Sequence, residues 1–143
     1  NSATVAAAAV AAHECGHALQ HAFGYAPLRL RSALVPAVNF ASKWLTWILL
    51  LGILLINSFP QLLTFGVILY ALTTLFSFIT LPVEINASVR AVAWLEKAGI
   101  TDYQTTPMAA AALRSAAYTY VVAALSSLAT LVYYVMIYLG RRD

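Results

Sequence analysis

The sequence predicts an all-α fold, a polytopic membrane helical bundle with about three transmembrane helices. Of its 143 residues, 62% are hydrophobic and 9% are charged, whereas an average soluble domain has about 45–50% and 25%. Residues 44–83 carry no charged side chain, and neither do residues 115–140. Because one spanning helix needs about 20 apolar residues, the first stretch can hold two spans and the second can hold one.

The three predicted spans belong to a single membrane-embedded domain, residues 1–143. The first two form a hairpin whose turn, Asn57-Ser58-Phe59-Pro60-Gln61, is rich in turn-forming residues. The third has tyrosines near both of its ends, where membrane interfaces favour them. In order along the chain, the spans are residues 44–59, 62–81 and 115–139.

Two amphipathic helices are expected on either side of the hairpin. Residues 6–23 form the first, which ends before Gly24. Residues 82–98 form the second, with Pro82 in its first turn and Gly99 just past its end. The segments left over, expected to be connectors or surface helices, are residues 28–43 and 100–112.

The distribution of basic residues predicts which side of the membrane these helices occupy. A two-span hairpin returns the chain to the side it left, so both amphipathic helices lie on the same side. Cytoplasmic segments carry an excess of Lys and Arg, and the hairpin turn has none. Arg141 and Arg142 fall on the other side, but six basic residues against two favour the cytoplasm for the amphipathic helices. The six are Arg29, Arg31, Lys43, Arg90, Lys97 and Arg114.

Charge and cysteine content exclude other classes of protein. The net charge is +3, and the basic residues are scattered, whereas a nucleic-acid partner would require a basic stripe. The single Cys15 excludes a disulfide within the chain. The lipid bilayer is therefore the expected surrounding of this protein, and no nucleic acid is expected to bind.

The first amphipathic helix carries the motif His13-Glu14-Cys15-Gly16-His17, which fits H-E-x-x-H. Residues four apart on a helix are separated by about 40° around the axis and roughly 6 Å along it, so both imidazoles can reach one Zn²⁺. Glu14 then projects beside the metal and can take a proton from bound water. Cys15 points away from the ligand face and is expected to be a small buried residue rather than a ligand. Gly16 is a poor helix former, which suggests the close approach of another helix or of substrate.

The third ligand is predicted to be Glu84. His21 continues the spacing of four, but it lies roughly 12 Å along the axis from His13 and is rotated by about 80°, which favours a helical-face or outer role. The metzincin pattern fails because Gln20 and Phe23 occupy its later positions. Glu84 stands where a span meets an amphipathic helix, and an ionisable residue there indicates function. The neighbours that could hold ligands or stabilise an oxyanion are Asn86, Ser88 and Arg90.

These residues resemble those of a known family. The segments that carry the resemblance are Ala11-Ala12-His13-Glu14-Cys15-Gly16-His17-Ala18-Leu19-Gln20, Leu81-Pro82-Val83-Glu84-Ile85-Asn86-Ala87-Ser88-Val89-Arg90-Ala91 and Leu139-Gly140-Arg141-Arg142. They are similar to the YugP-like family of "putative neutral zinc metallopeptidases" of bacterial membranes. The resemblance implies zinc at His13 and His17 with Glu14 as base, a multi-pass location in the bacterial inner membrane, and a further N-terminal span. The ligand set also resembles HtpX-type and CAAX-prenyl-protease-type enzymes, which have an Asp where this chain has Ser88.

The expected function is therefore that of a gluzincin-like, membrane-embedded zinc endopeptidase. Its substrates are expected to be membrane or juxtamembrane proteins or peptides, cleaved near the cytoplasmic face. Glu14 is the predicted base, and Arg90 or a tyrosine is expected to stabilise the oxyanion. Two alternatives stay open: a scaffold or partner-binding protein with a structural zinc site, and a metal transporter.

Overall fold

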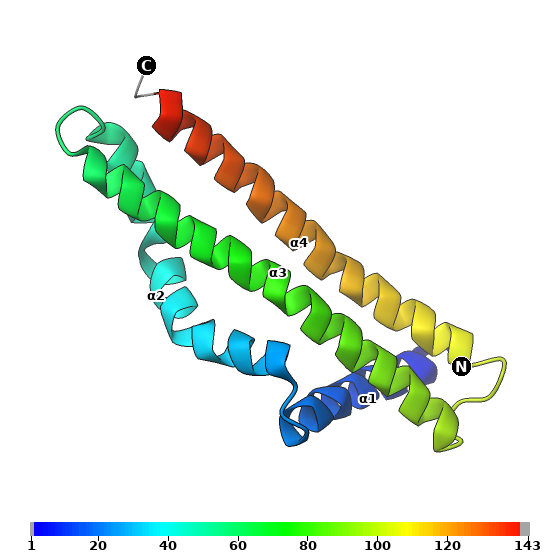
Figure 1. The fold of residues 1–143 in the computed structure, drawn as a ribbon. Coiled ribbons are helices and arrows are strands. Elements are labelled where there is room, and N and C mark those ends of the chain that lie inside the picture. Colours follow the sequence, from blue (N-terminus) through cyan, green and yellow to red (C-terminus); the bar gives the residue numbers. More distant parts are fainter. Residues whose placement is uncertain (1, 141–143) are drawn as a thin grey trace. The chain divides into compact units, whose positions relative to one another are not determined.

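A computed structural model describes residues 2–140, and this part of the chain forms four α-helices and no strand. The helices are α1 (Ser2–Ala22), α2 (Ala26–Leu54), α3 (Pro60–Lys97) and α4 (Thr106–Gly140) (Figure 1). The predicted all-α fold is confirmed.

The first and third helices end in the same way. Gly24 and Gly99 have φ angles of 66° and 73°, in the left-handed region that glycine adopts without steric penalty. The residue after each glycine, Tyr25 or Ile100, donates its backbone N–H to a carbonyl five residues earlier, at 2.9 and 3.0 Å. This is the Schellman pattern of helix ends, and it confirms both glycines as the predicted stop signals.

The helices extend further than the sequence suggests. Helix α3 is continuous through Pro82, so the predicted second span and the predicted second amphipathic helix are one element. Pro82 removes one i→i−4 hydrogen bond, but the sequences on both of its sides favour helix and the chain continues in the same direction. Of the two segments expected to be connectors or surface helices, residues 28–43 lie within α2, and α4 includes residues 106–112 of the segment 100–112.

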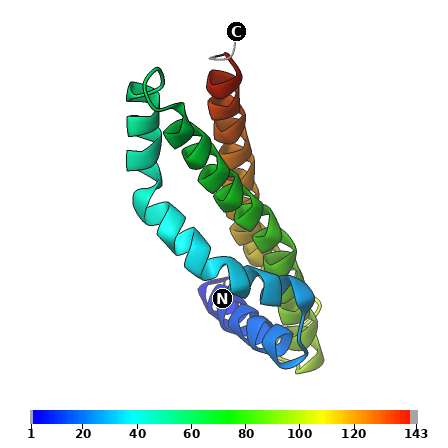
Figure 2. The ribbon, with the colours of Figure 1, turned by 60° about the vertical axis from the view of Figure 1, so that its left-hand side comes forward.

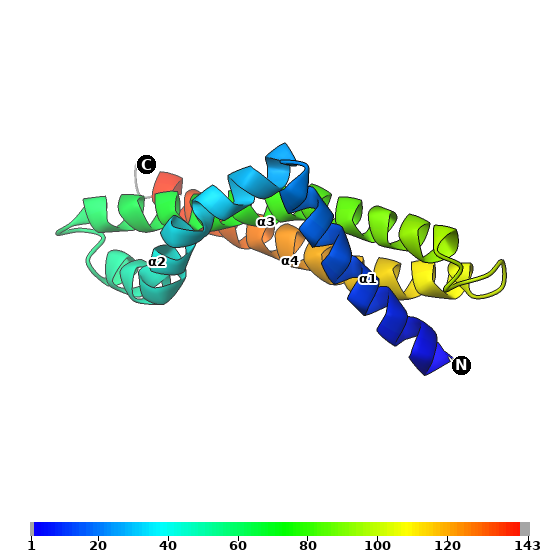
Figure 3. The ribbon, with the colours of Figure 1, turned by 90° about the horizontal axis from the view of Figure 1, so that it is seen from below.

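The chain divides into two compact units. The first unit comprises residues 1–31 and 79–122, and in it α1 crosses the antiparallel segments of α3 and α4 (Figure 3). Its core consists mainly of small side chains, which let the three helices approach closely. The buried residues of this core are Ala9, Ala12, Ala91, Leu95, Ala109 and Leu113.

The second unit comprises residues 32–78 and 123–143, of which the structure describes the latter segment as far as residue 140. The end of α2 and the start of α3 form a hairpin (Figure 2), with Leu45, Leu49 and Leu63 in the core. Side chains of α4, including Tyr134 and Ile137, pack against this cluster. The hydroxyls of Thr74 and Ser127 lie 2.7 Å apart and join α3 to α4.

Three of the helices are long and apolar enough to cross a membrane: α2, α3 and α4. Little of their apolar surface is buried within the chain, and in α4 only 6% of the most apolar stretch is buried. Apolar faces of this extent need an apolar environment.

Candidate metal centre

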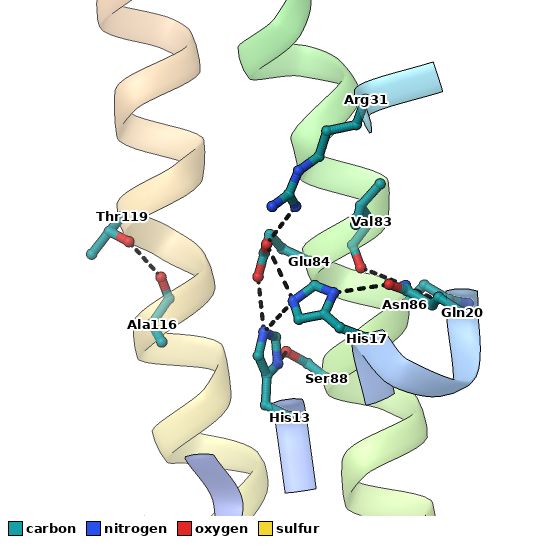
Figure 4. Close-up of polar contacts among 10 residues, drawn as sticks. All are labelled: His13, His17, Gln20, Arg31, Val83, Glu84, Asn86, Ser88, Ala116 and Thr119. Carbon is teal, nitrogen blue, oxygen red and sulfur yellow. Dashed lines mark hydrogen bonds and ion pairs between the residues drawn. The ribbon is translucent and has the colours of Figure 1, made fainter. Parts of the chain in front are cut away.

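The imidazoles of His13 and His17 lie side by side on α1. They are one turn apart, as residues four positions apart on a helix are. Their ring centres are 4.7 Å apart with perpendicular planes. Their Nε2 atoms are separated by 3.1 Å (Figure 4). Both rings therefore direct the same nitrogen toward one point.

Glu84 approaches the two imidazoles from α3. Its Oε2 lies 2.8 Å from His13 Nε2, and its Oε1 lies 3.4 Å from His17 Nε2. The residue is buried, with 4% of its surface exposed. Seventy-one positions separate Glu84 from His13 in the sequence, so the fold itself brings them together.

The three donors fit the requirements of a zinc ion. Ligand atoms at about 2.0–2.2 Å from a tetrahedral zinc are separated from one another by about 3.3–3.6 Å. His17 Nε2 lies 3.4 Å from Glu84 Oε1, within that range. The separation of 3.1 Å between the two Nε2 atoms and that of 2.8 Å between His13 Nε2 and Glu84 Oε2 are shorter by a few tenths of an ångström. His13, His17 and Glu84 thus form a candidate metal site. Three protein ligands leave one tetrahedral position open, as in catalytic rather than structural zinc sites.

The comparisons with known proteins agree with a zinc site, because the name of the matching family includes zinc. The model of the family described as "putative neutral zinc metallopeptidase" matches residues 1–139. The chain belongs to this family.

One curated relative of this chain is the Bacillus subtilis (strain 168) protein named "putative membrane protease YugP". The two are 44% identical over 140 residues, which cover 98% of this chain. The chain spans 61% of the length of that relative. No solved structure matches the chain.

Gln20 determines which nitrogen of His17 faces the site. Its side-chain NH₂ donates to the backbone carbonyl of Val83 at 2.8 Å and to Asn86 Oδ1 at 3.0 Å. With the amide in this orientation, Gln20 Oε1 is left as an acceptor, 2.9 Å from His17 Nδ1. His17 Nδ1 must then carry the proton, so the lone pair is on Nε2, where a metal ligand requires it.

Ser88 on α3 and Arg31 on α2 contact the other two candidate ligands, His13 and Glu84. Ser88 Oγ lies 3.1 Å from His13 Nδ1, so it occupies the nitrogen that faces away from the site. Arg31 Nη1 donates to Glu84 Oε1 at 2.9 Å. Such partners orient metal ligands and typically change metal affinity by about 10–100-fold.

Gly16 lets the H-E-x-x-H helix lie directly on α3. A Cβ at this position would stand 2.5 Å from the backbone carbonyl oxygen of Ala87. No side chain fits there without movement of one helix. The close helix approach that the sequence suggested at Gly16 is confirmed.

One of the sequence expectations needs revision. Cys15 is exposed rather than buried, because α1 packs through a different stripe, which includes Ala12, Gly16 and Gln20. Arg90, the expected oxyanion stabiliser, donates its Nε to Asn86 Oδ1 at 2.8 Å. This contact supports Asn86, and the role of Arg90 at the oxyanion stays a prediction.

Glu14 and His21 lie outside the ligand cluster, and both are exposed. The Glu14 carboxylate has no hydrogen-bond or ion-pair partner among residues 2–140. Sequence reasoning missed Gln20 and Arg31 as site residues. Gln20 carried a usable signal, because an amide three residues after His17 lies on the same helix face.

A cavity of about 160 Å³ adjoins the cluster, and we call it the metal cavity. His13 and Glu84 line it from α1 and α3, and Tyr120 lines it from α4. The Tyr120 hydroxyl makes no hydrogen bond within residues 2–140. The other residues that line the metal cavity are Val10, Ser88, Leu113, Ala116 and Ala117.

Proposed function

We propose that this protein is a membrane-embedded zinc endopeptidase that hydrolyses peptide bonds of membrane or juxtamembrane substrates. The observation that carries the proposal is the convergence of His13, His17 and Glu84 beside a cavity, in a chain of the zinc metallopeptidase family. The donor set of two imidazoles and one carboxylate is found in zinc peptidases, with the fourth position open for chemistry.

Glu14 is the proposed general base. When bound, Zn²⁺ would polarise the scissile carbonyl and lower the pKa of a bound water. Because the Glu14 carboxylate is exposed and has no partner among the described residues, it is free to accept a proton from the attacking water. It can then return the proton to the departing amine.

Tyr120 is the proposed donor to the oxyanion. It lines the metal cavity from the helix opposite Glu84, and its hydroxyl is unoccupied by residues 2–140. Losing one such donor typically reduces kcat by about 10²–10³-fold. Tyr120→Phe is expected to lower kcat by that factor while KM and zinc content hold. Tyr103→Phe changes an exposed tyrosine that lies outside the metal cavity and should leave kcat unchanged; equal kinetics in the two variants would remove Tyr120 from the mechanism.

The proposed location is the bacterial inner membrane, with the site toward the cytoplasm. Helices α2, α3 and α4 are long and apolar enough to span. Glu84 follows the proposed span of residues 62–81 by three positions, about 5 Å along a helix, which puts it at the membrane boundary. Six basic residues on this side, against none in the hairpin turn, support the cytoplasmic orientation.

The deciding experiment compares Glu14→Gln with Cys15→Ser in the full chain, purified into lipid nanodiscs. The wild-type protein should cleave quenched peptides, and a zinc chelator should abolish the cleavage. Glu14→Gln should lower turnover by about 10²–10⁴-fold and still bind one zinc per chain. Cys15→Ser changes an adjacent exposed residue and should keep full activity.

The same experiment distinguishes the alternatives. A structural-zinc scaffold would bind zinc and cleave nothing, and a metal transporter would move zinc across a vesicle membrane without cleavage. Undiminished turnover by Glu14→Gln would refute the mechanism. The exposure of Cys15 and His21, both outside the ligand cluster, already disfavours a closed four-ligand structural site.

A further inference from the structure

A second and larger cavity, which we call the α3–α4 groove, lies in the first unit. Its volume is about 530 Å³, within the roughly 300–1,000 Å³ typical of ligand sites. Its walls are mainly aliphatic and come from two helices only. Those wall residues include Ile85, Val89 and Val92 on α3 and Leu113, Ala117 and Val121 on α4.

The groove adjoins the metal cavity. Ser88, Leu113 and Ala117 line both, and Ser88 also contacts the ligand His13. A chain whose scissile carbonyl lies in the metal cavity therefore has its neighbouring residues at the entrance to the groove.

The groove leads away from the ligands along the helix pair. On α3 its lining runs from Ile85, next to Glu84, to Glu96. These eleven positions correspond to about 16 Å of helix. An extended peptide advances about 3.3 Å per residue, so a segment of about five residues matches this length.

The chemistry of the groove favours apolar side chains. Its charged residues are Glu96 and Arg114, which are both exposed and have opposite signs, so the groove has no net charge to select an ion. Apart from the hydroxyls of Ser88 and Tyr118, burial of apolar groups against the aliphatic walls is the remaining source of affinity.

We propose that the α3–α4 groove binds about five consecutive, predominantly apolar residues of the substrate chain, on one side of the scissile bond. The protein would thus select cleavage sites next to an extended apolar segment, such as an unwound end of a membrane span. This inference rests on the proposed peptidase function for its substrate, but the groove can be tested without turnover.

The test uses two adjacent alanines of α4. Ala110 lines the groove, whereas Ala111 is exposed and lies outside it. Ala110→Trp should fill the groove and Ala111→Trp should not. Each is made in the Glu14→Gln chain, loaded with zinc in nanodiscs. The probes are two labelled peptides that differ only in five residues, Leu-Ala-Val-Leu-Ala or Ser-Asn-Ser-Gln-Ser. Anisotropy titrations give the Kd of each peptide.

The Glu14→Gln parent should bind the apolar peptide at least about tenfold more tightly than the polar peptide, as one or two buried aliphatic groups allow. Ala111→Trp should keep this preference, and Ala110→Trp should reduce it to about twofold or less. Ala93→Trp fills the groove from α3 and decides the matter if Ala110→Trp does not fold, as judged by circular dichroism.

Two results would overturn the proposal. The first is an equal preference for the apolar peptide in Ala110→Trp and Ala111→Trp. The second is a bound acyl chain that native mass spectrometry detects in the parent but not in Ala110→Trp, and that the apolar peptide does not displace. The outcome is separable from that of the proposed function. If the wild-type chain never cleaves a peptide but the Ala110-dependent preference is observed, the proposal for the groove is supported and the proposed peptidase function is wrong. If cleavage occurs without this preference, the proposal for the groove is wrong and the proposed peptidase function is supported.

Discussion

The first unit joins its helices through a polar network as well as a small apolar core, whereas the second unit joins them mainly through apolar side chains. In the first unit, Gln20, Arg31 and Ser88 connect α1, α2 and α3 around the ligands. In the second unit, Leu45, Leu49 and Leu63 form the core. All three His residues and all Asp and Glu residues but Asp143 belong to the first unit.

This difference assigns separate tasks to the two parts of the chain. Polar networks orient ligands when every member is satisfied, and the first unit has no buried side-chain N or O atom left without a partner among the described residues. The apolar unit supplies surface suited to a bilayer. Changes in the ligand network of the first unit should therefore alter zinc binding, and changes in the second unit should alter stability alone.

The largest effect is expected from Glu84→Ala, which removes one of the three donors. Zinc affinity should fall by more than about 100-fold, beyond the 10–100-fold typical of losing an outer hydrogen-bond partner. Competition with a chromogenic chelator measures this affinity. The control is Thr74→Val in the second unit, which loses the hydrogen bond to Ser127 and should bind zinc like the wild type. Unchanged affinity in Glu84→Ala would mean that another group is the third ligand.

Gln20→Leu should give the next largest effect, a zinc affinity about 10–100-fold weaker. The substitution removes the acceptor that fixes the His17 tautomer and the donor that ties α1 to α3. His21→Leu changes the neighbouring exposed residue and serves as the matched control. If both variants bind zinc equally well, the Gln20 contacts do not orient the ligand.

Two glycines offer a direct comparison between the units. A Cβ at Gly16 would stand 2.5 Å from Ala87 O, and a Cβ at Gly52 would stand 2.9 Å from Leu63 Cα. Both Gly→Ala variants should lower the free energy of unfolding by about 1–3 kcal/mol through overpacking. Only Gly16→Ala should also weaken zinc binding, because it pushes α1 away from Glu84. Equal zinc affinity in the two variants would contradict the division of tasks.

Local signals in the sequence predicted much of the fold and part of the site. Gly24 and Gly99 end helices through their own backbone freedom, and His13 and His17 share a helix face through their spacing. Glu84 could be proposed because the chain has few other carboxylates. Each of these inferences needs only the neighbouring residues in the sequence or the number of carboxylates in the chain.

The remaining features depend on partners distant in the sequence. Gln20 and Val83 O are 63 positions apart, and Arg31 and Glu84 are 53 apart, so nothing near these residues marks their contacts. The continuity of α3 at Pro82 has a similar origin. Proline weakens a helix locally, but whether the helix breaks depends on the packing of the segments around it.

The smallest effect is expected at Asp102, in the first unit but outside the ligand network. The backbone N–H groups of Thr105 and Gln104 donate to its carboxylate at 2.9 Å each, and they hold the pKa of Asp102 below its usual value. The carboxylate therefore stabilises the fold fully above its unfolded pKa of about 3.9. That contribution is lost as the pH falls through the lower, folded pKa.

Asp102→Asn keeps an acceptor oxygen for the same N–H groups but cannot titrate. Unfolding midpoints of the metal-free wild type and variant should therefore differ little below the folded pKa of Asp102, and the wild type should gain slightly on the variant as the pH rises from there to about 5. Metal-free protein is required because acid also releases bound metal. Zinc affinity at pH 7 should be the same in both. If it differs, the ligand network extends to the turn before α4, and the site is larger than its hydrogen bonds indicate.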